Sequence, residues 1–376
     1  MTSIPRKNTR QVKIGPVTVG GGAPVRIQSM TTTHTRDVDA TVDQIQQLTE
    51  AGCEIVRVAC PTEADARSLG KIKSRIKIPL VADIHFNYRF ALIALDEGVD
   101  KLRLNPGNIG KKDRTVEIVE KAKKMRVPIR IGVNGGSLEK DLMEKFGPTP
   151  EALVESAKRH VAILEELDFH DIIISLKASD VPTMVASYRL ASQIFDYPLH
   201  LGVTEAGTLL RGSIYNAIGI GTLLQEGIGD TIRVSLTAES VEEIKVGKMI
   251  LEALGLRKGV RVISCPSCGR AEVDVFKLAN EVESRAMAQI KDPMTISVLG
   301  CVVNGPGEAH ESDFGVTGGK DKGMIYIDGK QRRVVDEAKL VDELFKEIET
   351  RRKGPSDPDQ NSSPSEKSSS SQIYEQ

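Results

Sequence analysis

A short strand-like segment followed by a helix-like segment recurs eight times between Val25 and about Leu256, and this repeat limits the possible folds more than any other feature. Each strand-like segment is rich in β-branched residues, and a loop with Gly, Pro or Asn separates it from a longer segment with apolar residues at helical spacing. The strand-like segments are Val25–Met30, Ile55–Cys60, Leu80–His85, Lys101–Asn105, Ile129–Asn134, Ile172–Lys177, Leu199–Thr204 and Thr231–Leu236. Alternating strands and helices in this number predict an α/β fold of the (β/α)8, or TIM-barrel, type. A doubly wound open sheet is the alternative.

Other patterns flank this repeat. Val12–Ile14 and Val17–Val19 around Gly15-Pro16 predict a small hairpin at the base of the barrel. After Leu256 the sequence predicts strands at Val260–Ser264 and Thr295–Leu299, a hairpin of Phe314–Thr317 with Met324–Ile327, and a last helix with one apolar stripe. We therefore expect a barrel domain (1–256), a small α+β domain (257–353) and a Ser-rich tail (354–376). The tail holds too few apolar residues to offset its ordering entropy, so we expect it to be disordered.

Composition excludes several classes of partner. Lys and Arg number 51 against 52 Asp and Glu, so no net basic field favours nucleic acid. Aromatic residues make up 4% and tryptophan is absent, which argues against base stacking. No apolar run reaches the ~20 residues of a membrane span, and the polar segment Met1–Arg10 is not typical of a signal peptide. Five cysteines without an export signal favour reduced thiols and a cytoplasmic location.

Arginine stands in the middle of five of the predicted strands. These residues are Arg26, Arg57, Arg103, Arg130 and Arg233. A barrel strand is covered on both faces, and an unpaired buried charge is costly, yet Asp83 and Glu205 are the clear strand acids. Lys177 adds a further cation at a strand end. We therefore predict an anionic ligand, which Arg can bind with paired N–H groups. The alternative is that these side chains extend outward to helix carboxylates.

Polar residues gather at the predicted strand ends, where barrel enzymes place their catalytic groups. They are Asp83, His85, Asn105, Asn108, Asn134, Ser137, Ser179, Thr204, Glu205 and Ser235. The sequence Asn134-Gly-Gly-Ser would expose backbone N–H groups to a phosphate, although these residue types are also common in turns.

The histidines differ in expected role. His85 is a candidate general acid or a partner of Asp83, which is two residues away on the same side of the strand. His200, near the start of a strand, favours a structural role. His34, His160 and His170 are expected at the surface or in capping positions.

Three cysteines fall in two Gly- and Pro-rich loops of the small domain. They are Cys265 and Cys268, in Cys-x2-Cys spacing, and Cys301, 33 residues later. Three thiolates suit either zinc or an iron–sulfur cluster. Zinc would take His310 as a fourth ligand in a structural site, and a cluster would take an oxygen of Glu308. The residue pattern leaves both open. Cys53 and Cys60 fit small core residues.

Five motifs occur together and in order: Asp-Ile-His-Phe, Leu-Arg-Leu-Asn-Pro-Gly-Asn, Arg-Ile-Gly-Val-Asn-Gly-Gly-Ser-Leu, Cys-Pro-Ser-Cys-Gly-Arg and Cys-Val-Val-Asn-Gly-Pro-Gly-Glu. From about Arg10 to Lys353 the chain resembles the bacterial 4-hydroxy-3-methylbut-2-enyl-diphosphate synthases of isoprenoid biosynthesis, in their shorter two-domain form. The Ser-rich tail lies outside the family pattern.

The resemblance implies an oxidoreductase with a [4Fe–4S] cluster. Cys265, Cys268 and Cys301 match the thiolate ligands, and Glu308 matches the ligand of the fourth iron. The implied reaction is the two-electron reductive ring opening and dehydration of 2-C-methyl-D-erythritol 2,4-cyclodiphosphate. The matching substrate contacts are Arg57, Asp83, His85, Arg103, Asn105, Arg130, Asn134, Lys177, Thr204, Glu205, Arg233 and Ser235. The resemblance also implies a flavodoxin or ferredoxin as electron donor, and a homodimer in which the cluster domain of one chain caps the barrel of the other.

Residue roles follow as hypotheses. Glu205 would donate the proton for loss of water, with Asp83 and His85 shaping its surroundings. One rival is a phosphate-binding barrel lyase or isomerase with Lys177 as Schiff-base nucleophile and a structural zinc. Another is an iron–sulfur sensor that binds an anion without turnover.

Overall fold

The computed structural model describes residues 4–85, 87–109, 112–301, 312–319 and 321–353. The chain divides into two compact units, Met1–Arg257 and Lys258–Gln376. We describe each unit by itself. Within the described ranges, no helix combines the length and apolar character that crossing a membrane requires.

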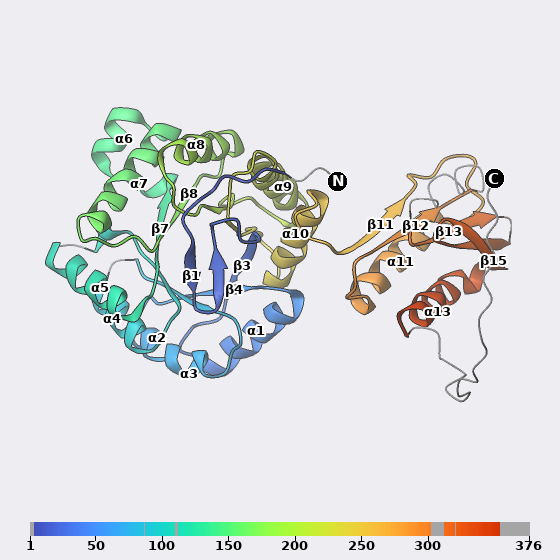
Figure 1. Ribbon diagram of the computed structural model, residues 1–376, viewed down its shortest axis with the longest axis horizontal. Helices are drawn as coiled ribbons and strands as arrows, with labels where there is room; N and C mark the ends of the chain where they lie inside the picture. Colours follow the sequence, from blue (N-terminus) through green and yellow to red (C-terminus); the bar gives the residue numbers. More distant parts are fainter. Residues whose placement is uncertain (1–3, 86, 110–111, 302–311, 320, 354–376) are drawn as a thin grey trace, which may run out of the picture. The chain divides into compact units, whose positions relative to one another are not determined.

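The first unit is an eight-stranded sheet of parallel strands surrounded by helices (Figure 1). Its strands are β3 (Arg26–Met30), β4 (Ile55–Ala59), β5 (Leu80–Asp83), β6 (Lys101–Arg103), β7 (Ile129–Asn134), β8 (Ile172–Lys177), β9 (His200–Leu201) and β10 (Thr231–Ile232). They pair in the order β8-β7-β6-β5-β4-β3-β10-β9. A parallel bridge between Ile174 and Leu199 nearly closes the ring. The predicted (β/α)8 barrel is therefore confirmed, and the open sheet is excluded.

Helices follow the strands as the repeat predicts. They are α1 (Val38–Ala51), α2 (Glu63–Arg67), α3 (Leu69–Lys73), α4 (Tyr88–Asp96), α5 (Lys112–Met125), α6 (Lys140–Phe146), α7 (Pro150–Glu165), α8 (Val181–Ile194), α9 (Leu209–Gln225) and α10 (Ser240–Ala253). Two 3-10 turns, η1 (Pro106–Asn108) and η2 (Gly135–Ser137), follow β6 and β7. Helix α1 shows the local rules: the Asp37 side chain caps its first turn, and Gly52 ends it at φ +106°, a conformation that favours glycine.

The hairpin of β1 (Val12–Ile14) and β2 (Val17–Val19) forms where the sequence predicts it. Its side chains Val12, Ile14 and Val19 are buried. They form one apolar cluster with residues from the first half of three barrel strands, among them Ile55 and Val81. The hairpin therefore covers the N-terminal end of the barrel.

In its described residues, the second unit contains a five-stranded sheet and the helices α11 and α13, consistent with the predicted α+β class. Its elements are β11 (Val260–Ser264), α11 (Val275–Gln289), β12 (Met294–Leu299), β13 (Phe314–Gly319), β14 (Lys322–Ile327), β15 (Lys330–Asp336), η3 (Glu337–Lys339) and α13 (Leu340–Lys353). Strands β11 to β13 are parallel, and β14 and β15 continue the sheet in antiparallel fashion. The sequence pattern missed β15 because this edge strand is mostly exposed and carries charged rather than alternating residues. The predicted tail lies outside the described residues.

Candidate active site

A cavity of about 100 Å³ opens at the C-terminal end of the barrel strands. Its lining residues are Arg57, Asp83, His85, Arg103, Arg130, Gly132, Asn134, Ser175, Lys177, Thr204 and Arg233. Five of these described residues are cationic side chains and one is a carboxylate. The cations that line this small cavity suit a phosphate group with the rest of a ligand extending outward.

The alternation of side chains along each strand places these groups in the lumen. On β7, Arg130, Gly132 and Asn134 line the cavity, whereas Ile131 and Val133 between them belong to the hydrophobic core. An apolar run interrupted at every second position is therefore the sequence signal of a polar barrel interior.

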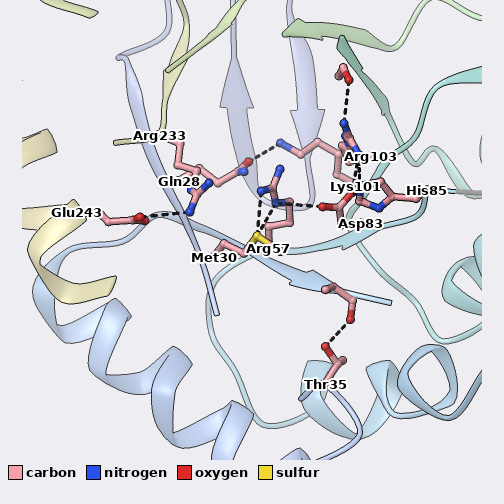
Figure 2. A network of polar contacts seen from close by, with 12 residues as sticks. Gln28, Met30, Thr35, Arg57, Asp83, His85, Lys101, Arg103, Arg233 and Glu243 are labelled. Carbon is pink, nitrogen blue, oxygen red and sulfur yellow. Dashed lines mark hydrogen bonds and ion pairs between the residues drawn. The ribbon is translucent and has the colours of Figure 1, made fainter. Parts of the chain in front are cut away.

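Asp83 is the centre of the ion pairs in the cavity (Figure 2). Arg103 Nη1 lies 3.1 Å from its Oδ1, and Arg57 Nε lies 3.6 Å from its Oδ2. Burial acts to raise the pKa of this carboxyl, but Arg57 and Arg103 hold the pKa below its usual value. Asp83 is therefore an anion that partly offsets the cations.

His85 contacts the same pair. Its Nε2 lies 2.9 Å from Arg103 Nη1, which is always a donor, so Nε2 accepts and the proton belongs on Nδ1. Nδ1 lies 3.7 Å from Asp83 Oδ1. Burial lowers the pKa of His85, although Asp83 opposes this shift. The network thus assigns a neutral imidazole at neutral pH.

Two cations of the cavity have partners that the sequence reasoning missed (Figure 2). Arg57 directs Nε and Nη2 at Met30 Sδ, at 3.1 and 2.9 Å. Arg233 Nη2 lies 3.2 Å from Oε1 of the buried Glu243, whose Oε2 accepts a 2.9 Å hydrogen bond from Ser29. Glu243 lies on the buried face of α10 beside Ser240 and Ile244. The sequence signal for this partner was an acidic residue at a helix position whose neighbours on the same face are buried.

Arg130 and Lys177 line the cavity without a carboxylate at ion-pair distance among the described residues. Both are buried, and no described residue accepts a hydrogen bond from Nε or Nη2 of Arg130. Burial, and then neighbouring cations, lower the pKa of both groups well below their usual values. An anion in the cavity would stabilise both charged forms.

Three of the expected contacts do not line the cavity. Asn105 is buried and bonds both its Oδ1 and Nδ2 to the backbone of Gly132, at 2.8 and 3.1 Å, which joins β6 to β7. Ser235 is half-buried. Glu205 is exposed, next to Thr204, and has a φ of +54°. Such backbone strain in a non-glycine residue is most common at functional sites.

Arg26 is the exception among the strand arginines. Its Nη1 lies 2.8 Å from Glu54 Oε1, and it does not line the cavity. Arg26 begins β3, at the end of the strand opposite the cavity, so the expectation that it serves the anion is wrong.

The three loop cysteines differ from the two barrel cysteines. Cys53 and Cys60 are buried, and burial raises the pKa of each thiol to about 12. Cys265, Cys268 and Cys301 are partly or fully exposed, at the ends of the parallel strands β11 and β12 or just beyond. Hydrogen bonds from the backbone N–H of Arg270, and then from its side chain, lower the pKa of Cys268. This shift favours the thiolate form, which is the form that binds metals.

The loop backbone also fits a group bound by sulfur. Gly300 N donates to Cys265 Sγ at 3.3 Å, and a Cβ on Gly300 would lie 2.4 Å from a Val275 methyl. Only glycine therefore permits this approach beside the thiol. Among the described residues, no three His, Cys, Asp or Glu side chains are grouped closely enough to hold a metal ion. Glu308 and His310 lie outside the described residues.

Known proteins share this architecture and sequence. The models of the GcpE TIM-barrel domain and the GcpE protein C-terminal domain match residues 9–248 and 261–350. The chain belongs to the GcpE family. The family expected from the five motifs is thus confirmed.

Relatives from three organisms carry the same name, "4-hydroxy-3-methylbut-2-en-1-yl diphosphate synthase (flavodoxin)". The GcpE protein of Caldanaerobacter subterraneus is 58% identical over 92% of this chain and 97% of its own length. That of Clostridium perfringens is 58% identical over 92% and 99% of the two chains. That of Geobacillus kaustophilus is 56% identical over 92% and 93%.

Proposed function

We propose that this chain converts 2-C-methyl-D-erythritol 2,4-cyclodiphosphate to (E)-4-hydroxy-3-methylbut-2-enyl diphosphate, as a cytoplasmic oxidoreductase. The observation that carries the proposal is the cavity with five cationic side chains and one carboxylate, in a chain whose relatives are named for a diphosphate product. Ring opening and loss of water consume two electrons, which a flavodoxin or ferredoxin supplies.

The barrel residues bind and orient the substrate. Arg57, Arg103, Arg130, Lys177 and Arg233 bind the diphosphate oxygens, with Asn134 and Thr204 at the rim. Because these cations are fixed in a buried site, they also stabilise the negative charge that develops on oxygen as the ring C–O bond breaks. Asn105 and Ser235 contribute to substrate binding from the loops around the cavity.

Cys265, Cys268, Cys301 and Glu308 would hold a [4Fe–4S] cluster. When bound, such a cluster supplies single electrons and a Lewis-acidic iron. The exposed thiols, the lowered pKa of Cys268 and the glycine beside Cys265 support this assignment.

The cofactor can be measured directly in anaerobically purified protein. We expect roughly four iron and four sulfide per chain, a thiolate-to-iron absorption band, and turnover of the cyclodiphosphate with reduced flavodoxin. Replacing Cys301 by Ser should remove iron, while Cys53→Ser, at a buried thiol, should retain it. One tightly bound zinc without sulfide would instead support the rival lyase or isomerase, with Lys177 as its nucleophile.

We assign Glu205 as the proton donor for loss of the hydroxyl group, assisted by Asp83 and His85. Glu205→Gln should lower kcat about 10²- to 10³-fold, because the amide cannot deliver the proton. Iron content and the visible spectrum should not change. Glu239→Gln is the matched control, since Glu239 is also exposed and follows the next strand. Near-normal turnover of Glu205→Gln with an intact spectrum would remove Glu205 from this role.

We also propose that the protein is a homodimer. Leu210, Ile214 and Ile218 lie at four-residue intervals on α9 and are 76%, 48% and 54% exposed, an apolar stripe that a second copy would cover. Leu210→Glu should shift the sedimentation coefficient to that of a monomer at micromolar concentration. Met125→Glu, at an exposed side chain on α5, should not. A monomeric wild-type protein would contradict the proposal.

A further inference from the structure

His160 is buried on α7 and connects two loops at the mouth of the barrel. It is 3% exposed, so the expectation of a surface or capping position is wrong. Its Nδ1 accepts a 3.1 Å hydrogen bond from the backbone N–H of Gly107 in η1. Its Nε2 lies 3.4 Å from Oε1 of Glu139, at the start of α6. One side chain therefore contacts the loop after β6 and the loop after β7.

The hydrogen bonds fix the state of the ring. A backbone N–H can only donate, so Nδ1 must be the unprotonated nitrogen and Nε2 carries the proton that faces Glu139. Burial also lowers the pKa of His160, while Glu139 opposes the shift and Arg159 supports it. A protonated ring would turn an N–H toward the Gly107 donor, so only the neutral tautomer holds both loops.

Glycine is required on the other side of this contact. A Cβ on Gly107 would lie 2.7 Å from Cε1 of His160, closer than side chains approach one another. On the carboxylate side, Oε2 of Glu139 is buried and no described residue bonds to it, while Oε1 faces the His160 ring. Loss of the imidazole would therefore remove the hydrogen bond to the Gly107 N–H and the polar contact with Glu139.

Both loops adjoin the anion cavity. Turn η1 begins after Asn105, whose side chain bonds to Gly132 in the cavity wall. Turn η2 begins after Asn134, which also lines the cavity. The 16-residue helix α7 is a rigid support for the ring between them.

We propose that His160 is a positioning residue that, in its neutral Nε2–H form, joins the loops after β6 and β7 and so sets the affinity of the barrel for the diphosphate group. The proposal rests on the function proposed above. In this role His160 contacts neither the reacting carbon atoms nor the path of the electrons. A change in His160 should therefore alter substrate affinity more than the chemical step.

Two amide substitutions separate the two contacts. In His160→Asn the side-chain Oδ1 can replace Nδ1 as the acceptor for Gly107, whereas in His160→Gln the amide reaches the position of Nε2 and loses that acceptor. We expect His160→Gln to raise KM for the cyclodiphosphate, and Kd for inorganic diphosphate by calorimetry, about five- to tenfold with kcat nearly unchanged. His160→Asn should retain most of the affinity. Gly107→Ala should weaken binding as His160→Gln does, and the double variant should be no weaker than either.

The tautomer can be read independently of function. In long-range ¹H–¹⁵N spectra of histidine-labelled protein, the ring signals that His160→Gln removes should be those of a neutral ring with its proton on Nε2. Equal affinity losses in the Asn and Gln variants, additive losses with Gly107→Ala, or a proton on Nδ1 of the His160 ring would overturn the proposal. Failure of the wild-type protein to bind diphosphate would instead reject the proposed function and leave the assigned tautomer intact.

Discussion

Replacing Arg130 by methionine should make the ligand-free protein more stable while it removes most of the activity. Arg130 is 1% exposed, and two of its nitrogens lack an acceptor among the described residues. Replacing uncompensated buried charge with an apolar side chain of similar length stabilises by about 1–2 kcal/mol, which raises Tm by about 2–8 °C. The same change removes a fixed cation from the diphosphate site, so kcat/KM should fall about 10³-fold.

Arg26→Met is the matched control for that result. Arg26 occupies a strand of the same barrel but already has a carboxylate partner, with 2.8 Å between its Nη1 and Glu54 Oε1. This variant should lose a little stability and keep its kcat/KM. If thermal unfolding shows that both substitutions destabilise equally, the cation in the lumen is compensated by groups other than a ligand.

Asp83→Asn should be the most damaging conservative change in the barrel. The amide keeps the volume but leaves Arg57 and Arg103 without their shared anion, and breaking a buried ion pair in this way costs about 3–5 kcal/mol. Because we propose that these arginines orient the substrate, the loss of their anion partner should lower kcat/KM at least about 10³-fold. Urea unfolding and steady-state kinetics at pH 7 measure both effects.

The pH dependence of stability tests the same residue. The folded pKa of Asp83 lies below its unfolded value of about 3.9, so its contribution is complete above that value and is lost as pH falls toward the folded pKa. The difference between wild type and Asp83→Asn should therefore shrink below about pH 4. Asp141→Asn, at an exposed ion pair with Arg159, should change the stability far less than Asp83→Asn does at neutral pH, because solvent screens exposed pairs. A gap that stays constant through acid would contradict the assigned ion pairs.

The barrel could be predicted from sequence because its signals are local. Period-two strands, helical spacing and turn residues recur in every unit, and each can be read within about a dozen residues. Strand β15 carries no such signal, since a solvated edge strand has no buried face to make its residues alternate.

The sequence predicted which kinds of residue form the site, but not which of these residues pair with one another or with other parts of the chain. Strand arginines indicated an anion, but which of them had a protein partner depended on pairs distant in sequence, such as Arg233 with Glu243 on a later helix. His160 could have been placed correctly. It follows Ala157 by three residues and precedes Leu164 by four, so it shares their buried face. Because histidine was treated as a polar surface residue, the position of His160 on this buried helix face was not used.

Because the apolar hairpin covers the N-terminal end of the barrel, the lumen opens at the C-terminal ends of its strands. With Val12, Ile14 and Val19 stopping the lower end, a ligand enters and departs by the same opening among the strand ends. If the proposed diphosphate binds the cations that line the cavity, its charged end enters first and its carbon skeleton faces outward. Product and substrate therefore use the same opening. In each turnover the product must leave the lumen before the next substrate molecule can bind inside it.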